Sequence, residues 1–116
     1  MLAQLKVLFV CSKNQWRSPT AERLWRRDAR FAVRSAGTSA GAAHVISWDD
    51  IAWADVIFVM EEKHKQRVLA VYGQQGSKPN IVVLDIPDEY RFMSHELVEL
   101  LTEQVTPLLD SLVQQK

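Results

Sequence analysis

The sequence has only one cysteine, Cys11, among its 116 residues. A single cysteine excludes an intramolecular disulfide and any metal site built from several thiolates. The first residues also lack the charged region and apolar stretch of a signal sequence. We therefore expect a cytoplasmic protein with a free thiol.

Long apolar runs and an excess of charge are also absent. The longest apolar runs, such as residues 56–60, are far shorter than the roughly 20 residues that cross a bilayer. Lysine and arginine number 14 and equal the 14 acidic residues, so no global field attracts a polyanion. We expect neither nucleic acid nor a membrane as a partner. Local clustering of arginine after Cys11 could attract an anionic substrate, although a solvated helix face explains it as well.

Glycine and proline are scarce, with four of each, while 47% of the residues are hydrophobic. This composition excludes collagen-like and disordered chains and is typical of a globular protein. A chain of this length buries about two thirds of its unfolded surface around one core. We expect a single domain over residues 1–116, as a monomer or a weak homo-oligomer.

Short apolar runs alternate with segments of helix-forming residues. The predicted strands are 5–10, 31–35, 56–60 and 80–84. The predicted helices are 18–28, 47–54, 61–72 and about 94–114, with Ser18 and Ser47 as N-caps and with Pro107 as a break or kink. Strands that alternate with helices predict an α/β three-layer sandwich, with a parallel sheet covered on both faces.

The candidate reactive residue, Cys11, lies where the first predicted strand ends. Ligands of parallel sheets bind outside the carboxyl ends of the strands, near loop amides and helix N-termini. Five residues separate Cys11 from Arg17, enough for a loop whose amides surround one tetrahedral anion while Arg17 grips two of its oxygens. The same amides and helix dipole favour a thiolate. The loop therefore suits both phosphate binding and nucleophilic attack.

The other residues of this loop have smaller predicted roles. Ser18 can donate its hydroxyl to the thiolate, and Asn14 can bond to loop carbonyls. The remaining members of the predicted phosphate-binding loop are Ser12, Lys13, Gln15 and Trp16. A buried structural thiol is the plainer alternative, but such a thiol needs no anion-binding loop around it.

The segment VLFVCSKNQWRSPTAE, at residues 7–22, closely resembles the phosphate-binding loop of the low-molecular-weight protein tyrosine phosphatases. The similarity continues through SAGT at 35–38 and through residues 47–69, so it covers nearly the whole chain. It implies a four-stranded parallel sheet, a phosphocysteine intermediate, and neither metal nor cofactor. It also implies that the substrate is a phosphorylated protein or a small phosphomonoester.

The resemblance assigns roles by position. Cys11 matches the nucleophile, Arg17 the phosphate clamp and Asn14 the loop organiser. Ser18 matches the hydroxyl that faces the thiolate, and Ser35 matches a serine that supports the loop from outside.

The family also has an aspartate that protonates the leaving oxygen, followed by a proline and an aromatic residue after the fourth strand. Here residues 85–90 read DIPDEY, which has these ingredients in an altered order. Asp85 directly follows the strand and is the first candidate, while Asp88, closer to Tyr90, is the second. For either aspartate, a turn or helix-capping role is the plainer alternative.

Three departures from the family bear on the substrate. Trp16 replaces the second cysteine that many members carry, which removes the protective disulfide of those enzymes. Lys13 replaces a small residue, which adds positive charge at the rim or alters the loop path. The link between Thr38 and Ser47 is short where typical members have a longer insertion with a helix. We expect a shallower pocket, so a preference for phosphotyrosine does not follow.

The aromatic and histidine residues suggest little further chemistry. Trp16, Trp48 and Tyr90 are candidates for an aromatic wall, and Trp48 suits helix packing equally well. The three histidines show no metal-ligand spacing and are expected to be ordinary surface or helix residues: His44, His64 and His95.

Two other functions remain open beside phosphate-ester hydrolysis. Arsenate reduction uses the same oxyanion loop in resembling proteins, but with one cysteine it would need an external thiol. A non-catalytic module that recognises a phosphorylated partner is the second alternative, because the acid loop is altered.

Overall fold

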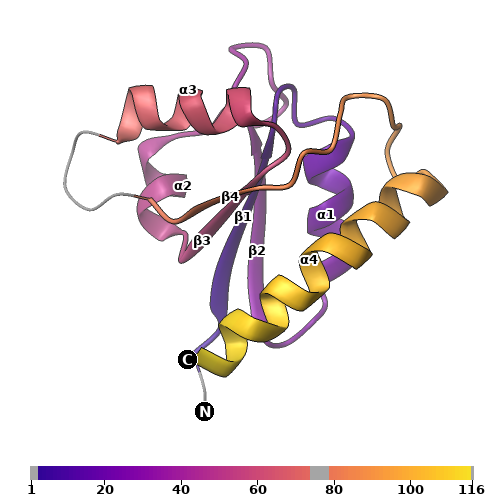
Figure 1. The fold of residues 1–116 in the computed structure, drawn as a ribbon. Helices are drawn as coiled ribbons and strands as arrows, with labels where there is room; N and C mark the ends of the chain where they lie inside the picture. The colour runs from indigo at the N-terminus through magenta and orange to yellow at the C-terminus, as the bar shows by residue number, and fades with distance from the viewer. Residues whose placement is uncertain (1–2, 74–78, 116) are drawn as a thin grey trace.

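Four parallel strands form the centre of the computed structural model, which describes residues 3–73 and 79–115. They lie in the order β2-β1-β3-β4 (Figure 1). Their bounds are Leu5–Cys11 for β1, Phe31–Gly37 for β2, Val56–Val59 for β3 and Ile81–Val83 for β4. The four predicted strands are confirmed. The first two extend past their predicted ends, so that Cys11 pairs with Gly37 at the carboxyl edge of the sheet.

Helices cover both faces of this sheet (Figure 1). Helices α1 and α4 lie on one face, and α2 and α3 lie on the other. Their bounds are Arg17–Trp25 for α1, Trp48–Trp53 for α2, Glu62–Tyr72 for α3 and His95–Gln115 for α4. The predicted three-layer α/β sandwich is confirmed. None of the helices in the described segments is long and apolar enough to cross a membrane.

The side chains of β1 divide between two cores because successive strand residues point to opposite faces. Leu5, Val7 and Phe9 pack toward α1 and α4, with the Phe9 ring stacked on Trp25 at 5.7 Å. Leu8 and Val10 pack toward α2 and α3 in the second core. A strand buried on both faces is nearly continuously apolar, as this one is. The double burial holds the end of β1, and therefore Cys11, in a fixed position.

The helix boundaries correct two predictions. Ser18 does not cap α1: the N-cap residue is Trp16, with no side-chain capping bond, and the Ser18 hydroxyl lies against Cys11 instead. Pro107 does not divide the last helix, which runs as one element through it. The Ser47 cap is confirmed, because its hydroxyl accepts a hydrogen bond from the backbone of Asp50. The sequence also predicts a turn-rich stretch over residues 73–79, which lies mostly outside the described residues.

Candidate active site

The loop between β1 and α1 is folded against the short link that follows β2. The carbonyls of Cys11, Ser12 and Lys13 accept hydrogen bonds from backbone amides of the link, at 2.9–3.0 Å. Loop carbonyls that face the link leave the inner side of the loop to its amides, which is the arrangement of an anion-binding nest. The short link is therefore part of the framework of the loop.

The thiol of Cys11 is buried at the centre of this loop, with 3% of the residue exposed. Its sulfur lies 3.0 Å from the hydroxyl oxygen of Ser18 and accepts a hydrogen bond from the backbone N–H of Asn14 at 3.3 Å. Both groups can donate to a thiolate. A charged hydrogen-bond acceptor gains more from such donors than a neutral one, so the surroundings of the thiol suit its anionic form.

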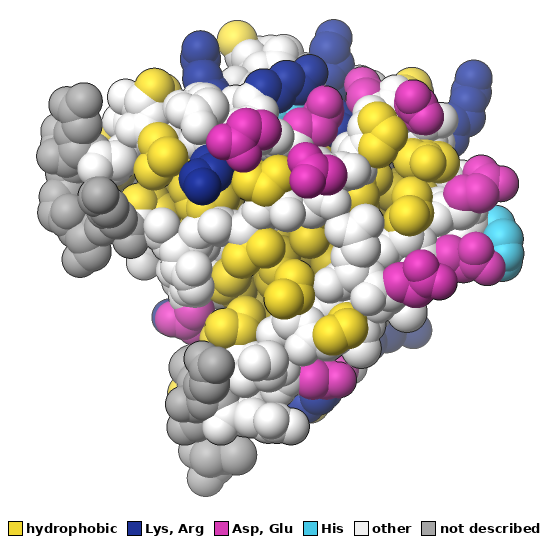
Figure 2. All heavy atoms as spheres, viewed as in Figure 1, with side chains coloured by type: hydrophobic (Ala, Val, Ile, Leu, Met, Phe, Trp, Pro, Cys, Tyr) yellow, Lys and Arg dark blue, Asp and Glu magenta, His cyan; other side chains and the backbone are white. Residues whose placement is uncertain are grey.

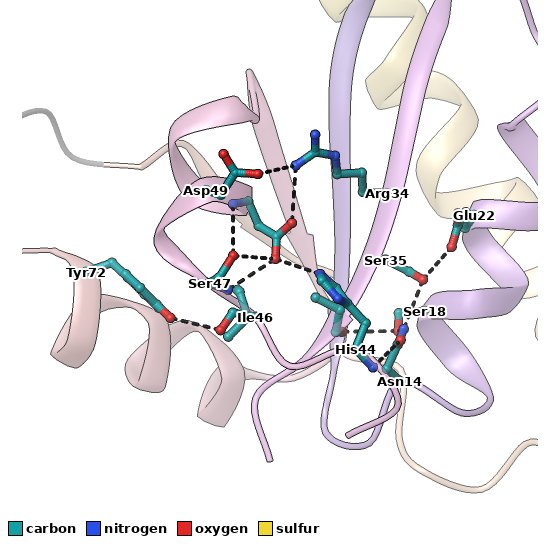
Figure 3. Close-up of polar contacts among 12 residues, drawn as sticks. Asn14, Ser18, Glu22, Arg34, Ser35, His44, Ile46, Ser47, Asp49 and Tyr72 are labelled. Atoms are coloured by element: carbon teal, nitrogen blue, oxygen red, sulfur yellow. Dashed lines mark hydrogen bonds and ion pairs between the residues drawn. The ribbon is translucent and has the colours of Figure 1, made fainter. Parts of the chain in front are cut away.

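Asn14 connects the loop to β2 and to the link (Figure 3). Its side-chain nitrogen donates to the hydroxyls of Ser18 and Ser35, each at 2.9 Å, and its oxygen accepts from the backbone N–H of His44 at 3.1 Å. Ser35 in turn donates to the carboxylate of Glu22. Sequence analysis expected Asn14 to bond to loop carbonyls, whereas its amide contacts two hydroxyls and a backbone N–H. Its φ of 55° is a left-handed conformation that asparagine tolerates better than most residues.

Arg17 is buried at the end of the loop, with its side chain only 2% exposed. Its Nη1 donates to the carboxylate of Glu61 at 2.5 Å and to the carbonyl of Ile86 at 2.8 Å, which uses both Nη1 hydrogens. Among the described residues, Nε and Nη2 make no hydrogen bond, and Nε forms a longer ion pair, 3.6 Å, with the carboxylate of Asp88. The edge formed by Nε and Nη2 is therefore available to grip two oxygens of an anion.

Two further residues contact this loop, Glu61 through Arg17 and His64 through Ser12, and the sequence does not single them out. Burial opposes ionisation of Glu61, but its hydrogen bond to Arg17 and the charge of Arg17 outweigh burial and lower its pKa. His64 does lie on a helix, as expected, but it is buried and contacts Ser12. A signal existed for both: they lie in the loop and the first turn of the helix that follow β3, at the edge of the sheet where ligands bind.

A cavity of about 280 Å³ opens above the thiol. Its lining residues are Cys11, Lys13, Gln15, Trp16, Arg17 and Asp88. Figure 2 shows Lys and Arg side chains beside Asp and Glu side chains along the upper edge of the molecule, the edge at which β1 ends in Figure 1. The cavity therefore combines a thiol, positively charged side chains and a carboxylate.

The structure separates the two candidate acids. Asp88 lines the cavity with Cys11, and its side chain is 55% exposed. Asp85 has a φ of 56° and lines a different hollow together with Glu61 and Pro87. Of the two candidates, Asp88 and not Asp85 lines the same cavity as Cys11.

The predicted aromatic wall is reduced to one residue. Trp16 lines the cavity and is 39% exposed. Trp48 packs edge-on against Tyr72, and Tyr90 packs against the core. Over the described segments, no cluster of three or more His, Cys, Asp or Glu side chains is placed to hold a metal ion.

The sequence matches the family model described as low molecular weight phosphotyrosine protein phosphatase over residues 6–46, a segment that contains the whole loop. No curated protein sequence matches the chain.

Solved structures with this fold cover almost the whole chain. YfkJ from Bacillus subtilis has a TM-score of 0.76 and 19% identity over 99% of this chain and 98% of its own. SP-PTP, a low molecular weight protein tyrosine phosphatase from Streptococcus pyogenes, has a TM-score of 0.78 and 20% identity over 94% and 93%. The YwlE arginine phosphatase from Geobacillus stearothermophilus has a TM-score of 0.69 and 22% identity over 96% and 92%. The family model thus confirms the resemblance at the loop, and the whole chain shares the fold of these structures.

Proposed function

We propose that the protein is a cysteine-dependent phosphomonoester hydrolase of the low-molecular-weight phosphatase type. One observation carries the proposal: Cys11, Arg17 and Asp88, which supply a thiol, a guanidinium and a carboxylate, line the same cavity. The family model supports it, because the matched segment contains both Cys11 and Arg17.

In the first step, the Cys11 thiolate attacks phosphorus, a P–S bond forms and the bond to the leaving oxygen breaks. Asp88 gives its proton to that oxygen. Arg17 holds two non-bridging oxygens through Nε and Nη2, while the loop amides hold the charge that develops on the phosphoryl group. Asp88 has to leave the neighbourhood of Nε, 3.6 Å away, as phosphate takes the free edge.

In the second step, a water attacks phosphorus and the P–S bond breaks. Asp88, now ionised, accepts a proton from the water, and inorganic phosphate leaves. The electron pair of the P–S bond returns to Cys11, where the Ser18 hydroxyl and the Asn14 N–H are placed to stabilise the thiolate. The cycle needs no electron donor and no metal ion.

We assign the substrate only as a phosphorylated protein or a small phosphomonoester. The similar structures include a protein tyrosine phosphatase and an arginine phosphatase, so similarity of fold does not choose the leaving group. A thiol nucleophile works where thiols stay reduced, and we therefore propose the cytoplasm as its location.

Hydrolysis of p-nitrophenyl phosphate between pH 4 and 8 tests this function. The wild type should turn over, and Cys11→Ser should have no measurable activity while retaining a wild-type unfolding temperature. Hydrolysis that persists in Cys11→Ser, or a pure wild type with no hydrolysis, would reject the proposal.

A further inference from the structure

His64 joins the first turn of α3 to the first residue after the nucleophile. The residue is only 1% exposed. Its Nδ1 accepts a hydrogen bond from the backbone N–H of Glu61 at 3.0 Å, and its Nε2 lies 2.8 Å from the hydroxyl oxygen of Ser12. Because Nδ1 is an acceptor, the proton of the neutral ring is on Nε2, and His64 donates to Ser12.

The surroundings of His64 keep its ring neutral. Burial, followed by the positive charge of Arg17, lowers its pKa to about 4, against the opposing effect of the Glu61 charge. The ring is therefore uncharged near neutral pH, and the backbone of Glu61 fixes its tautomer. At pH values well above 4, the neutral ring therefore donates to Ser12 from Nε2.

The same turn of α3 also holds the other end of the loop. The carboxylate of Glu61 accepts from Nη1 of Arg17, while its backbone N–H orients His64. Ser12, near the start of the phosphate loop, is thus hydrogen-bonded to His64, and Arg17, at its end, to Glu61, three positions before His64. The middle of the loop, at Asn14, is tied to β2 and the link instead.

We propose that His64 is a positioning residue of the phosphate site. It fixes the position of Ser12 relative to Arg17, whose guanidinium is held by Glu61. His64 does not line the cavity above Cys11, so it acts on the substrate only through the loop. Misplacement of loop amides by a fraction of an ångström weakens their contact with the anion, because such contacts depend steeply on geometry. The inference rests on the phosphatase activity proposed above.

Two substitutions separate positioning from a simple helix cap. In His64→Asn, the side-chain oxygen can replace Nδ1 as acceptor for the Glu61 N–H, but the side chain is too short to reach Ser12. In His64→Gln, the side-chain nitrogen can replace Nε2 as donor to Ser12. We expect His64→Gln to retain kcat/KM within about threefold, and His64→Asn to lose about tenfold, the equivalent of one buried hydrogen bond.

Ser12→Ala removes the other partner of the hydrogen bond between Ser12 and His64, without changing the hydrophobic core. It should lose about the same factor as His64→Asn, and the double variant should be no worse than either single variant, because both remove one interaction. His95→Asn is the matched control: His95 is 83% exposed and contacts only Glu99 among the interactions of the described residues. We expect it to have wild-type kcat/KM.

Affinity for inorganic phosphate, measured by calorimetry, gives a readout that does not require turnover. It should weaken in His64→Asn and Ser12→Ala and be preserved in His64→Gln. If the wild type hydrolyses nothing, the proposed function fails and phosphate affinity alone decides this inference. Wild-type kcat/KM and affinity in His64→Asn, or fully additive losses in the double variant, would overturn it.

Discussion

Two loops meet at the cavity, and they are held in opposite ways. The phosphate loop, from Cys11 to Arg17, is hydrogen-bonded to β2, to the link and to α3. The acid loop, residues 85–94, is anchored at its ends by buried Ile86 and by the Met93 N–H bonded to Thr20, but Asp88 between them is largely exposed. The first loop is therefore held in a fixed geometry by hydrogen bonds to three neighbouring elements, whereas the side chain of Asp88 in the second is largely open to solvent.

The largest effect should come from the clamp of the phosphate loop. Arg17→Lys replaces a planar fork by a point charge, which cannot bind two oxygens and also satisfy Glu61 and Ile86. We expect kcat/KM for p-nitrophenyl phosphate to fall by about 10³-fold. Steady-state kinetics checks this, and a loss of less than tenfold would show that the buried guanidinium is structural and not part of the phosphate site.

The acid loop should respond at one aspartate only. Asp88→Asn should lower kcat by about 10²-fold with a poorly leaving alkyl or peptidyl phosphate, because the leaving oxygen then lacks its proton donor. Asp85→Asn should leave kcat nearly unchanged, since asparagine also tolerates the φ of 56°. A loss in Asp85→Asn with a normal Asp88→Asn would return the acid to the residue that sequence analysis ranked first.

The middle of the phosphate loop should show a smaller, mixed effect. Asn14→Ala and Asn14→Gly both remove the bonds to Ser18 and Ser35 and should lower kcat/KM about tenfold. Asn14→Gly should be less destabilising by about 1 kcal/mol, because glycine adopts the φ of 55° without strain. Urea unfolding measures the difference. Equal stability of the two variants would mean that the backbone conformation costs nothing here.

The smallest effect is a dependence of stability on pH. The pKa of His64 is near 6.5 in the unfolded chain and about 4 in the folded protein. At pH values between these two, the unfolded chain binds the proton more readily, so acidification favours unfolding. The free energy of unfolding should fall by about 1 to 3 kcal/mol from pH 6.5 to 4, and the lowered pKa of Glu61 extends the loss to lower pH. His64→Gln should flatten this slope, and His95→Asn should not. An unchanged slope in His64→Gln would contradict the neutral buried ring.

The amino-acid sequence predicts the course of the phosphate loop far better than it predicts which side chain of the acid loop faces the cavity. The spacing from Cys11 to Arg17, a buried strand before it and a helix after it specify a closed loop locally, within a few residues. Asp85 and Asp88 are three residues apart in an irregular stretch, where only tertiary contacts decide which side chain faces the cavity. The prediction that Ser18 caps α1 is wrong for the same reason. Its hydroxyl is hydrogen-bonded to Cys11 and Asn14 across the loop and not to the backbone of its own helix.

Glu61 and His64 illustrate a second limit of sequence analysis. Their bonds to Arg17 and Ser12 span 44 and 52 positions in the chain. No local pattern encodes such pairs, although their position after β3 places them at the correct edge of the sheet.

Direct detection of the phosphocysteine is the decisive measurement. The Asp88→Asn variant should form the intermediate readily with p-nitrophenyl phosphate, whose leaving group needs little protonation, and should hydrolyse it slowly for want of a base. Acid quenching within the first turnover, followed by mass spectrometry of the peptides, should find one phosphoryl group on Cys11. Hydrolysis with no phosphoryl group on Cys11, or with the group on another side chain, would contradict the account.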